Sequence, residues 1–269
     1  MSYFGFLARF VFLPLIILRL ILWNDRRKGR TMPESMQSWP EDAVLLGHVG
    51  VAVAYTTPWD NYLVANKVWS YDPDLVTGVK IGWVPIEEYT FFIVQTLLTG
   101  SWLQVLAHRF PEDQTEYPNN PTPRIAFTGA LGVLWAASVY GLVRDRRNYL
   151  SLILSWALLP IMLQTGFGGD ILWRNRKLIA ASLIPTTAYL GLTDSIAIGS
   201  GTWTITPEHT VEREVIKNLP FEELLFFFLT NVLLVFGVTL VQSRESERRL
   251  PEALKGPYMR LKARILGSD

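Results

Sequence analysis

The chain is 269 residues long, and 49% of its residues are hydrophobic, 13% aromatic and only 18% charged. This composition is too apolar and too aromatic for an ordinary soluble domain and indicates an integral membrane protein. The absence of cysteine excludes disulfides, thiol nucleophiles and cysteine metal sites, and three scattered histidines exclude a histidine-rich metal cluster. A formal net charge of +1 argues against a nucleic-acid partner.

Seven apolar segments have the roughly 20 residues that a helix needs to cross a bilayer. They occupy residues 3–23, 43–63, 84–107, 125–143, 149–167, 177–198 and 219–242. The first could be taken for a signal peptide, but its apolar run is too long, it contains Arg9 and Arg19, and no small-residue cleavage site follows. We therefore expect an all-α polytopic membrane protein with about seven transmembrane helices.

An acidic-aromatic box occurs twice, each time at the start of a long apolar segment. The copies are Pro85-Ile86-Glu87-Glu88-Tyr89-Thr90-Phe91-Phe92 and Pro220-Phe221-Glu222-Glu223-Leu224-Leu225-Phe226-Phe227. Adjacent carboxyls at membrane depth are costly to keep, so they indicate a functional site. Aligning 84–98 with 219–233 gives six identities, which argues against an accidental arrangement.

The duplication extends upstream of the box. Asp60 precedes Trp69 by nine residues, and Asp194 precedes Trp203 by nine. From the aspartate to the first glutamate there are 27 residues in one copy and 28 in the other, so the copies differ by a single insertion. Each repeat then reads as three helices: a lead-in helix, one that ends at the aspartate, and one that begins with the box.

This repeat predicts the domain organisation. We expect one membrane domain over 1–242, with repeat one at 3–107, a linking helix at 125–143 and repeat two at 149–242, followed by a basic tail, 243–269. Because the linking helix adds a crossing, both repeats run in the same direction and both boxes lie on one side of the membrane. Parallel repeats of this type usually place the substrate site at their interface.

The distribution of basic residues predicts the orientation. Sixteen Lys and Arg residues lie on the side away from the boxes and seven on the box side. By the positive-inside rule the C-terminal tail is cytosolic and the boxes lie toward the other face. Residues 244–265 hold seven basic residues among apolar ones, which suits an amphipathic helix on anionic lipid; a disordered, solvated tail fits equally well.

The box itself has an ordinary and a chemical interpretation. Proline at the first helical position followed by glutamate is a common way to begin any helix, and this accounts for one glutamate per copy. It does not account for the second glutamate, which has two phenylalanines at i+3 and i+4 on the same helical face. These groups are Glu88 with Phe91 and Phe92, and Glu223 with Phe226 and Phe227.

Such a pairing of carboxyls and aromatic rings suits proton chemistry. In general, apolar surroundings and a neighbouring like charge raise a carboxyl pKa, whereas a helix N-terminus lowers it. If the first two prevail, one carboxyl of a pair stays protonated as a general acid and a partner takes a proton back. Aromatic faces attract cations by about 0.5 to 2 kcal/mol each. Such carboxyls can protonate a carbon-carbon double bond, and such rings can stabilise the resulting carbocation, without a redox cofactor.

Three motifs together resemble the membrane lycopene cyclases of the heterodimer type. They are the duplicated box, Pro58-Trp59-Asp60 followed by Lys67-Val68-Trp69-Ser70-Tyr71, and Gly201-Thr202-Trp203 after Asp194. In that family two small subunits, or one fused chain, cyclise the ends of linear carotenoids, and a related module begins the fungal bifunctional lycopene cyclase/phytoene synthases. The resemblance covers about 43–240 and fits the fused form.

The resemblance implies carotenoid biosynthesis by a lycopene β-cyclase, an isomerase of the intramolecular lyase type. It implies Glu88 and Glu223 as acid or base, with coupled partners Glu87 and Glu222 and with Asp60 and Asp194 orienting them or sharing protons. Candidates for a substrate-binding aromatic wall are Phe91, Phe92, Phe226, Phe227, Trp69 and Trp203. The tryptophans fit an interfacial belt equally well, and the phenylalanines fit lipid-facing or packing roles.

We expect no cofactor and no metal. Gly166-Phe167-Gly168-Gly169 follows a hydrophobic span and not a strand, so it lacks the context of a dinucleotide fingerprint. The aspartate-rich motifs of a phytoene synthase are missing as well. Expected partners are lycopene or a related linear carotenoid and the lipid bilayer, and other carotenoid-pathway enzymes are further candidates.

Two other classes of protein remain open. A membrane prenyltransferase should show aspartate-rich motifs for magnesium, and only Asp72-Pro73-Asp74 hints at one. A proton-coupled transporter could use the doubled glutamates as a relay, but the box helices carry only Gly100 and Gly237 as mid-span breakers. The sequence leaves open whether one or both substrate ends react, whether the ring is β or ε, and whether the substrate has 40 or 50 carbons. It also leaves open which glutamate is the acid and which the base, whether the boxes form one site or two, and the oligomeric state.

Overall fold

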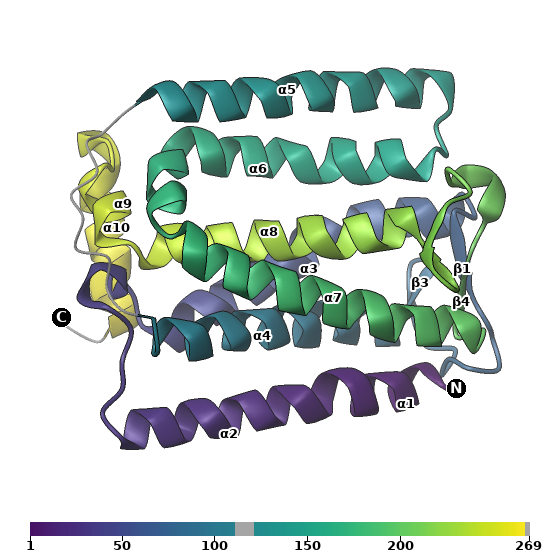
Figure 1. Cartoon of the computed structure of the whole chain (residues 1–269), viewed down its shortest axis with the longest axis horizontal. Helices are drawn as coiled ribbons and strands as arrows, with labels where there is room; N and C mark the ends of the chain where they lie inside the picture. Colours follow the sequence, from purple (N-terminus) through teal and green to yellow (C-terminus); the bar gives the residue numbers. More distant parts are fainter. Residues whose placement is uncertain (111–120, 267–269) are drawn as a thin grey trace.

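The structure is a computed structural model that describes residues 1–110 and 121–266, and over these residues it is a bundle of long helices (Figure 1). The N-terminal helix consists of α1 (Tyr3–Leu7), a π-helical turn η1 (Ala8–Phe12) and α2 (Leu13–Arg27). The long helices after it are α3 (Glu41–Ala65), α4 (Ile86–Ala107), α5 (Pro121–Arg144), α6 (Tyr149–Arg174), α7 (Arg176–Gly199) and α8 (Phe221–Gln242). Shorter helices are η2 (Glu34–Met36), η3 (Pro207–His209), α9 (Arg244–Arg248) and α10 (Glu252–Leu266).

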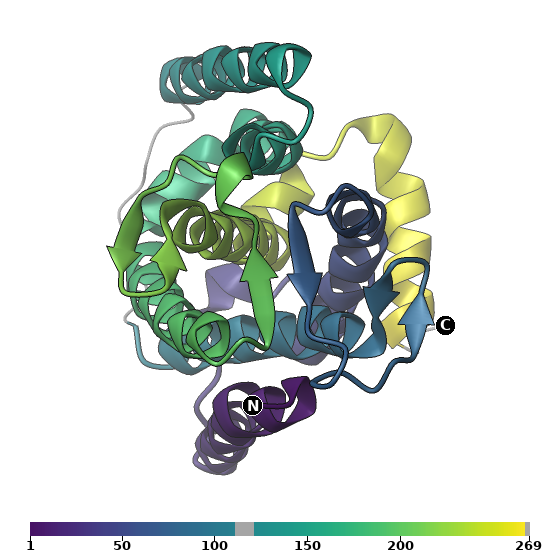
Figure 2. The ribbon, with the colours of Figure 1, turned by 90° about the vertical axis from the view of Figure 1, so that its right-hand side faces the viewer.

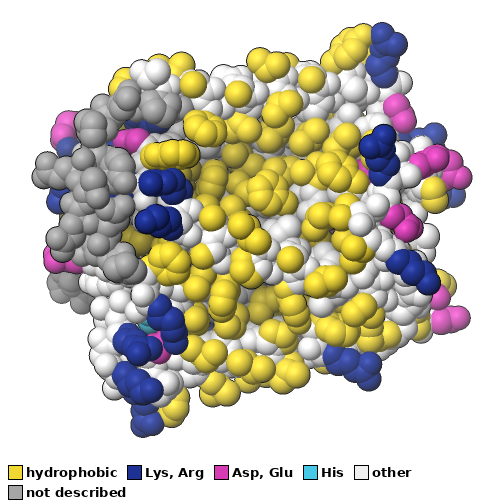
Figure 3. Space-filling view, viewed as in Figure 1, with side chains coloured by type: hydrophobic (Ala, Val, Ile, Leu, Met, Phe, Trp, Pro, Cys, Tyr) yellow, Lys and Arg dark blue, Asp and Glu magenta, His cyan; other side chains and the backbone are white. Residues whose placement is uncertain are grey.

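The all-α membrane fold is confirmed. Within the described residues, five helices are long and apolar enough to cross a membrane: Tyr3–Arg27, Ile86–Ala107, Arg124–Arg144, Tyr149–Arg174 and Phe221–Gln242. Helices α3 and α7, which carry the two aspartates, are long enough but less apolar. On the face shown in Figure 3, apolar side chains cover the middle of the molecule and charged ones gather at its two ends, as expected for a protein embedded in lipid.

Three pairs of short antiparallel strands lie at one end of the bundle. Strand β2 (Lys80–Ile81) pairs with β3 (Val84–Pro85), and β5 (Glu214–Ile216) pairs with β6 (Leu219–Pro220), so each box helix follows such a hairpin. Strand β1 (Trp69–Tyr71) pairs with β4 (Trp203–Ile205) and joins the two repeats, with Ser70 opposite Thr204. The sequence analysis did not anticipate these strands, because two or three residues are too few to show an alternating pattern.

The box proline does not occupy the position predicted for it. Pro85 and Pro220 end β3 and β6 with extended backbone angles, and the helices begin one residue later, at Ile86 and Phe221. The reason is that each proline is paired within its hairpin, which holds it out of the helical conformation. Both glutamates of each box still lie in the first helical turn.

The two box helices, α4 and α8, pack against each other and against α3 and α7 (Figure 2). A buried polar group ties them together. The side-chain oxygen of Asn231 accepts hydrogen bonds from Gln95 at 3.1 Å and Thr99 at 2.9 Å, and its nitrogen donates to Thr187 at 3.1 Å. Because unpaired amides are costly in an apolar interior, these bonds fix the depth of α8 relative to α4 and α7.

Of the two interpretations left open for the tail, the helix is the one that the structure shows. Arg249 makes a paired contact with Asp170 of α6, at 2.7 and 2.6 Å. Lys262 donates to Glu247 at 2.7 Å, and Tyr258 packs edge-on against Trp39. The tail is thus docked on the end of the bundle away from the hairpins (Figure 1).

Candidate active site

The second glutamates of the two boxes converge on one small cavity. Glu88 and Glu223 are both buried and both line a space of about 30 Å³ where the repeats meet. Six of the residues predicted from the sequence line it with them: Trp69, Phe91, Asp194, Trp203, Phe226 and Phe227. In this structure the two boxes therefore contribute to a single site.

A tyrosine holds each of these glutamates. The Tyr3 hydroxyl donates to Glu88 Oε2 at 2.5 Å, and the Tyr149 hydroxyl donates to Glu223 Oε1 at 2.6 Å. Each tyrosine is the first residue of its lead-in helix, α1 or α6. The lead-in helices thus place equivalent hydroxyls on equivalent carboxyls.

The sequence analysis missed both tyrosines, although a signal was present. Each follows a helix-capping residue, Ser2 in the first repeat and Asn148 in the second, whose side chain accepts a hydrogen bond from the backbone N–H three residues later. Aligning Ser2-Tyr3 with Asn148-Tyr149 extends the internal repeat to the lead-in helices.

The two halves differ at the position of Tyr71. Its hydroxyl donates a second hydrogen bond to Glu88 Oε2 at 3.0 Å, whereas the equivalent residue of the second repeat is Ile205. Tyr71 lies outside the membrane-spanning helices, and burial together with the nearby carboxyls of Asp60 and Glu88 raises its pKa well above its ordinary value. Tyr71 therefore remains a hydroxyl donor to Glu88.

The first glutamate of each box has a different environment. Glu87 Oε1 accepts a hydrogen bond from the Thr77 backbone N–H, and Glu222 Oε1 accepts one from the Val211 backbone N–H, both at 2.6 Å. Both side chains are buried and neither lines the cavity. They fasten the loop before each hairpin to the start of the box helix.

The aspartates also differ between the halves. Asp194 accepts a hydrogen bond from Trp203 Nε1 at 3.1 Å. Asp60 is 0% exposed, and neither of its oxygens has a hydrogen-bond partner among the described residues, nor does Trp69 Nε1. Asp60 interacts electrostatically with Glu88, and Asp194 with both cavity glutamates. Four carboxyls therefore form one buried group.

Aromatic rings enclose this group. Trp203 lies 4.8 Å from Tyr3 and 5.0 Å from Phe6 between ring centroids, and Phe226 stacks on Trp59 at 5.7 Å. The burial of Trp69 and Trp203 against the cavity favours the aromatic wall over an interfacial belt. Phe92 instead lines a larger neighbouring cavity. Rings around a cavity can stabilise a cation within it.

Fold and site together define a class: a polytopic membrane protein whose buried carboxyls meet, inside an aromatic enclosure, at the interface of two repeats. The model of the family described as "Lycopene cyclase" matches residues 43–106 and 146–241. The chain therefore belongs to the lycopene cyclase family and is an enzyme.

Individual relatives agree with this assignment. The chain is 38% identical over 245 residues to the lycopene beta-cyclase of Halobacterium salinarum, covering 89% of this chain and 95% of that protein. It is 34% identical to the bifunctional lycopene cyclase/phytoene synthases of Phycomyces blakesleeanus and Podospora anserina, covering 70% and 71% of this chain but only 32% and 33% of theirs. No solved structure matches.

Proposed function

We propose that this enzyme cyclises the linear ends of lycopene to β-ionone rings by proton transfer, without oxidation or reduction. One observation carries the proposal: Glu88 and Glu223 come from different repeats yet share one aromatic cavity, each held by a tyrosine hydroxyl. Two carboxyls across one enclosed space can act as general acid and general base on the same substrate end.

The reaction balances without a co-reactant. A carboxyl gives its proton to the terminal carbon-carbon double bond, whose electron pair forms the new C–H bond and leaves a tertiary cation. The electron pair of the next reacting double bond closes the ring onto that cation. A carboxylate then takes a proton from the ring, and the electron pair of that C–H bond forms the ring double bond, so that substrate and product are isomers. The surrounding rings stabilise the cationic stages.

The unequal hydrogen bonding of the glutamates supports different roles for them. Hydrogen bonds donated to a carboxylate favour its charged form. Glu88 accepts two, from Tyr3 and Tyr71, whereas Glu223 accepts one, from Tyr149. We therefore assign Glu223 as the general acid and Glu88 as the general base.

After each turnover the acid has lost a proton and the base has gained one, so a proton must return across the site. Asp194 interacts with both glutamates and lines the cavity, which suits it to this return, and Asp60 interacts electrostatically with Glu88. Glu87 and Glu222 contact backbone N–H groups outside the cavity, and we assign them as positioning residues.

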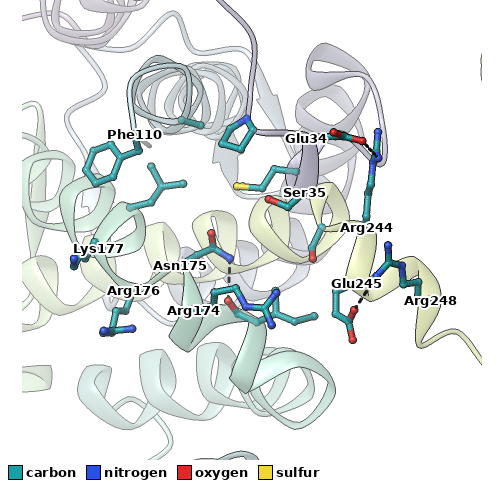
Figure 4. Close-up of a pocket in the computed structure, with 16 residues that line it drawn as sticks. Glu34, Ser35, Phe110, Arg174, Asn175, Arg176, Lys177, Arg244, Glu245 and Arg248 are labelled. Carbon is teal, nitrogen blue, oxygen red and sulfur yellow. Dashed lines mark hydrogen bonds and ion pairs between the residues drawn. The ribbon is translucent and has the colours of Figure 1, made fainter. Parts of the chain in front are cut away.

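The same proposal places the enzyme across the membrane by seven helices with its tail in the cytosol. A recess of about 660 Å³ lies at the end away from the hairpins, and its basic lining residues are Arg174, Arg176, Lys177, Arg244 and Arg248 (Figure 4). Its two acidic residues already pair with arginines, Glu34 with Arg244 and Glu245 with Arg248. By the positive-inside rule this basic end faces the cytosol.

Expression in a bacterium that accumulates lycopene tests the function, with pigments separated by chromatography. We expect wild type to form a cyclic isomer, and the double variant Glu88→Gln/Glu223→Gln to leave lycopene unchanged at an equal membrane level. Glu208→Gln, at an exposed position in the same region, is the matched control and should behave as wild type. Unchanged lycopene with the wild-type enzyme would contradict the proposal.

A further inference from the structure

A second cavity adjoins the glutamate cavity and is called the lateral groove here. It has a volume of about 250 Å³ and is lined by residues of α3, α4, α6 and α8. Phe91 and Phe226 line both cavities, so the two share a wall, and widening the glutamate cavity at these rings would join them. Viewed from the hairpin end, α6 and α3 are both neighbours of α8 (Figure 2), and all three helices contribute residues to the groove.

The lateral groove is long and runs parallel to the helices. Three helices each line it over a stretch of nine residues, and the eight rises of 1.5 Å between the first and the last correspond to about 12 Å. These stretches are 48–56 on α3, 156–164 on α6 and 226–234 on α8. The groove therefore leads from the catalytic end of the bundle toward the middle of the membrane.

The lining changes along the groove. Near the glutamates it is aromatic, and on the α3 side it opens to lipid, since Val51 is 65% and Tyr55 40% exposed. At the far end His48 Nδ1 lies 2.8 Å from the Val44 carbonyl, and the Gln164 amide donates to the Leu233 carbonyl at 2.8 Å. Apolar walls and a polar end define a slot for an apolar rod of limited length.

We propose that the lateral groove binds the unreacted polyene arm of a linear isoprenoid while the reacting end lies between Glu88 and Glu223. This inference rests on the proposed function. The glutamate cavity, at about 30 Å³, must widen even to admit a substrate end, so the rest of the molecule needs a continuous apolar path. The groove provides that path and opens to the lipid in which such a substrate dissolves.

Binding of the arm in the lateral groove limits the reaction to one substrate end at a time. Because the arm lies along the bundle and the glutamates lie at one end of it, only one end of the substrate reaches the acid in each binding event. A second ring then requires release of the one-ring product, reversal and rebinding.

A pair of alanines on α3 provides the test. Ala52 lines the groove, whereas Ala54, two residues further on, is exposed and does not line it. In purified protein we expect Ala52→Trp to lower the rate of lycopene cyclisation by about tenfold or more, since misplaced substrates lose rate steeply. Ala54→Trp should stay within about twofold of wild type, as surface substitutions usually do.

A shortened analogue with the same end group but no polyene arm separates groove binding from misfolding. Ala52→Trp should convert this analogue nearly as well as wild type does. Equal loss on both substrates, or wild-type activity of Ala52→Trp on lycopene, would overturn the inference. Failure of the wild-type enzyme to cyclise either substrate would contradict the proposed function instead.

A time course under excess lycopene gives an independent readout. We expect one-ring product that has left the enzyme to accumulate first, whether or not a two-ring product follows. Two-ring product from the earliest turnovers, with no free one-ring product, would overturn the inference.

Discussion

The two halves of the active site are built from the same parts but do not make the same hydrogen bonds. In the first half Glu88 accepts hydrogen bonds from two tyrosines, while Asp60 has no partner among the described residues. In the second half Glu223 accepts from one tyrosine, while Asp194 accepts from Trp203. The duplicated frame brings two like carboxyls together, and small differences between the copies give them different environments, as the proposed acid and base require.

The largest expected effect comes from removing either cavity glutamate. Glu88→Gln and Glu223→Gln should each lower the rate by about 100-fold or more, because each removes one of the two proton-transfer groups of a single site. Cyclic product measured by chromatography, normalised to membrane protein, gives the rate, with Glu208→Gln as the control. If each half were an independent site, each variant would keep roughly half of the activity.

Substitutions of the tyrosines test whether the unequal hydrogen bonding of Glu88 and Glu223 affects the reaction. Glu223 becomes charged as it gives up its proton, and a hydrogen bond to a charged group contributes about 1.5 to 3 kcal/mol, so Tyr149→Phe should slow the reaction by about tenfold or more. Tyr3→Phe should have a smaller effect, because Tyr71 still donates to Glu88. Adding Tyr71→Phe to Tyr3→Phe should bring the loss to the level of Tyr149→Phe.

Tyr140→Phe, on the exposed face of α5, is the matched control for these substitutions and should behave as wild type. Equal losses in Tyr3→Phe and Tyr149→Phe would show that the second donor to Glu88 has no part in distinguishing the halves.

The first glutamates should matter less than the second. In Glu87→Gln and Glu222→Gln the amide oxygen can still accept the backbone hydrogen bond, so we expect only a small loss. About 1 kcal/mol corresponds to a loss of about fivefold. Rates and melting temperatures measured together check this, and a loss as large as that of Glu88→Gln would assign these residues to the chemistry.

The smallest effect concerns the tail, which neither half of the site contacts. Burial opposes ionisation of Glu247, but hydrogen bonds from Lys262 and Ser38 hold its pKa below the usual value. The resulting stability is complete above the ordinary glutamate pKa of about 4.3 and is lost as the pH falls through the lower folded-state value. The protection factor of the α10 amides against hydrogen exchange should therefore fall on acidification below about pH 4.3.

The matched variant for this prediction is Glu247→Gln, whose α10 should exchange faster at neutral pH and lose the dependence on acid. A wild-type α10 that is equally protected on both sides of this pH range would contradict the role of Glu247.

Much of the fold could be predicted from the sequence. Five of the seven expected spans lie within observed helices, and the other two, 84–107 and 219–242, begin two residues before α4 and α8, because apolar runs of membrane length are the strongest pattern a sequence carries. The hairpins could not be predicted, since their strands depend on backbone pairing and not on side-chain periodicity. The same pairing moved Pro85 and Pro220 out of the helices that they were expected to begin.

Only part of the candidate site could be predicted from the sequence. The repeat predicted that Glu88 and Glu223 are equivalent, but only the packing of α4 against α8 shows them in one cavity. Tyr3 and Tyr149 were missed because their partners lie 85 and 74 residues away; the shared capping residue before each tyrosine marks the repeat but does not report such a contact. The two adjacent glutamates of each box make different contacts, and the first glutamate binds a backbone N–H of the loop before the hairpin. The position of that loop could not be predicted from the sequence either.

The central claim is that Glu88 and Glu223 act together in one site, and a double-mutant cycle on the purified enzyme tests it most directly. Initial rates of lycopene cyclisation would be compared for wild type, each single Gln variant and the double variant. We predict that the double variant is no more than a few-fold slower than the slower single variant, because residues that act as a unit show strongly non-additive losses. Losses that multiply, or single variants that each keep roughly half of the wild-type rate, would contradict a shared site.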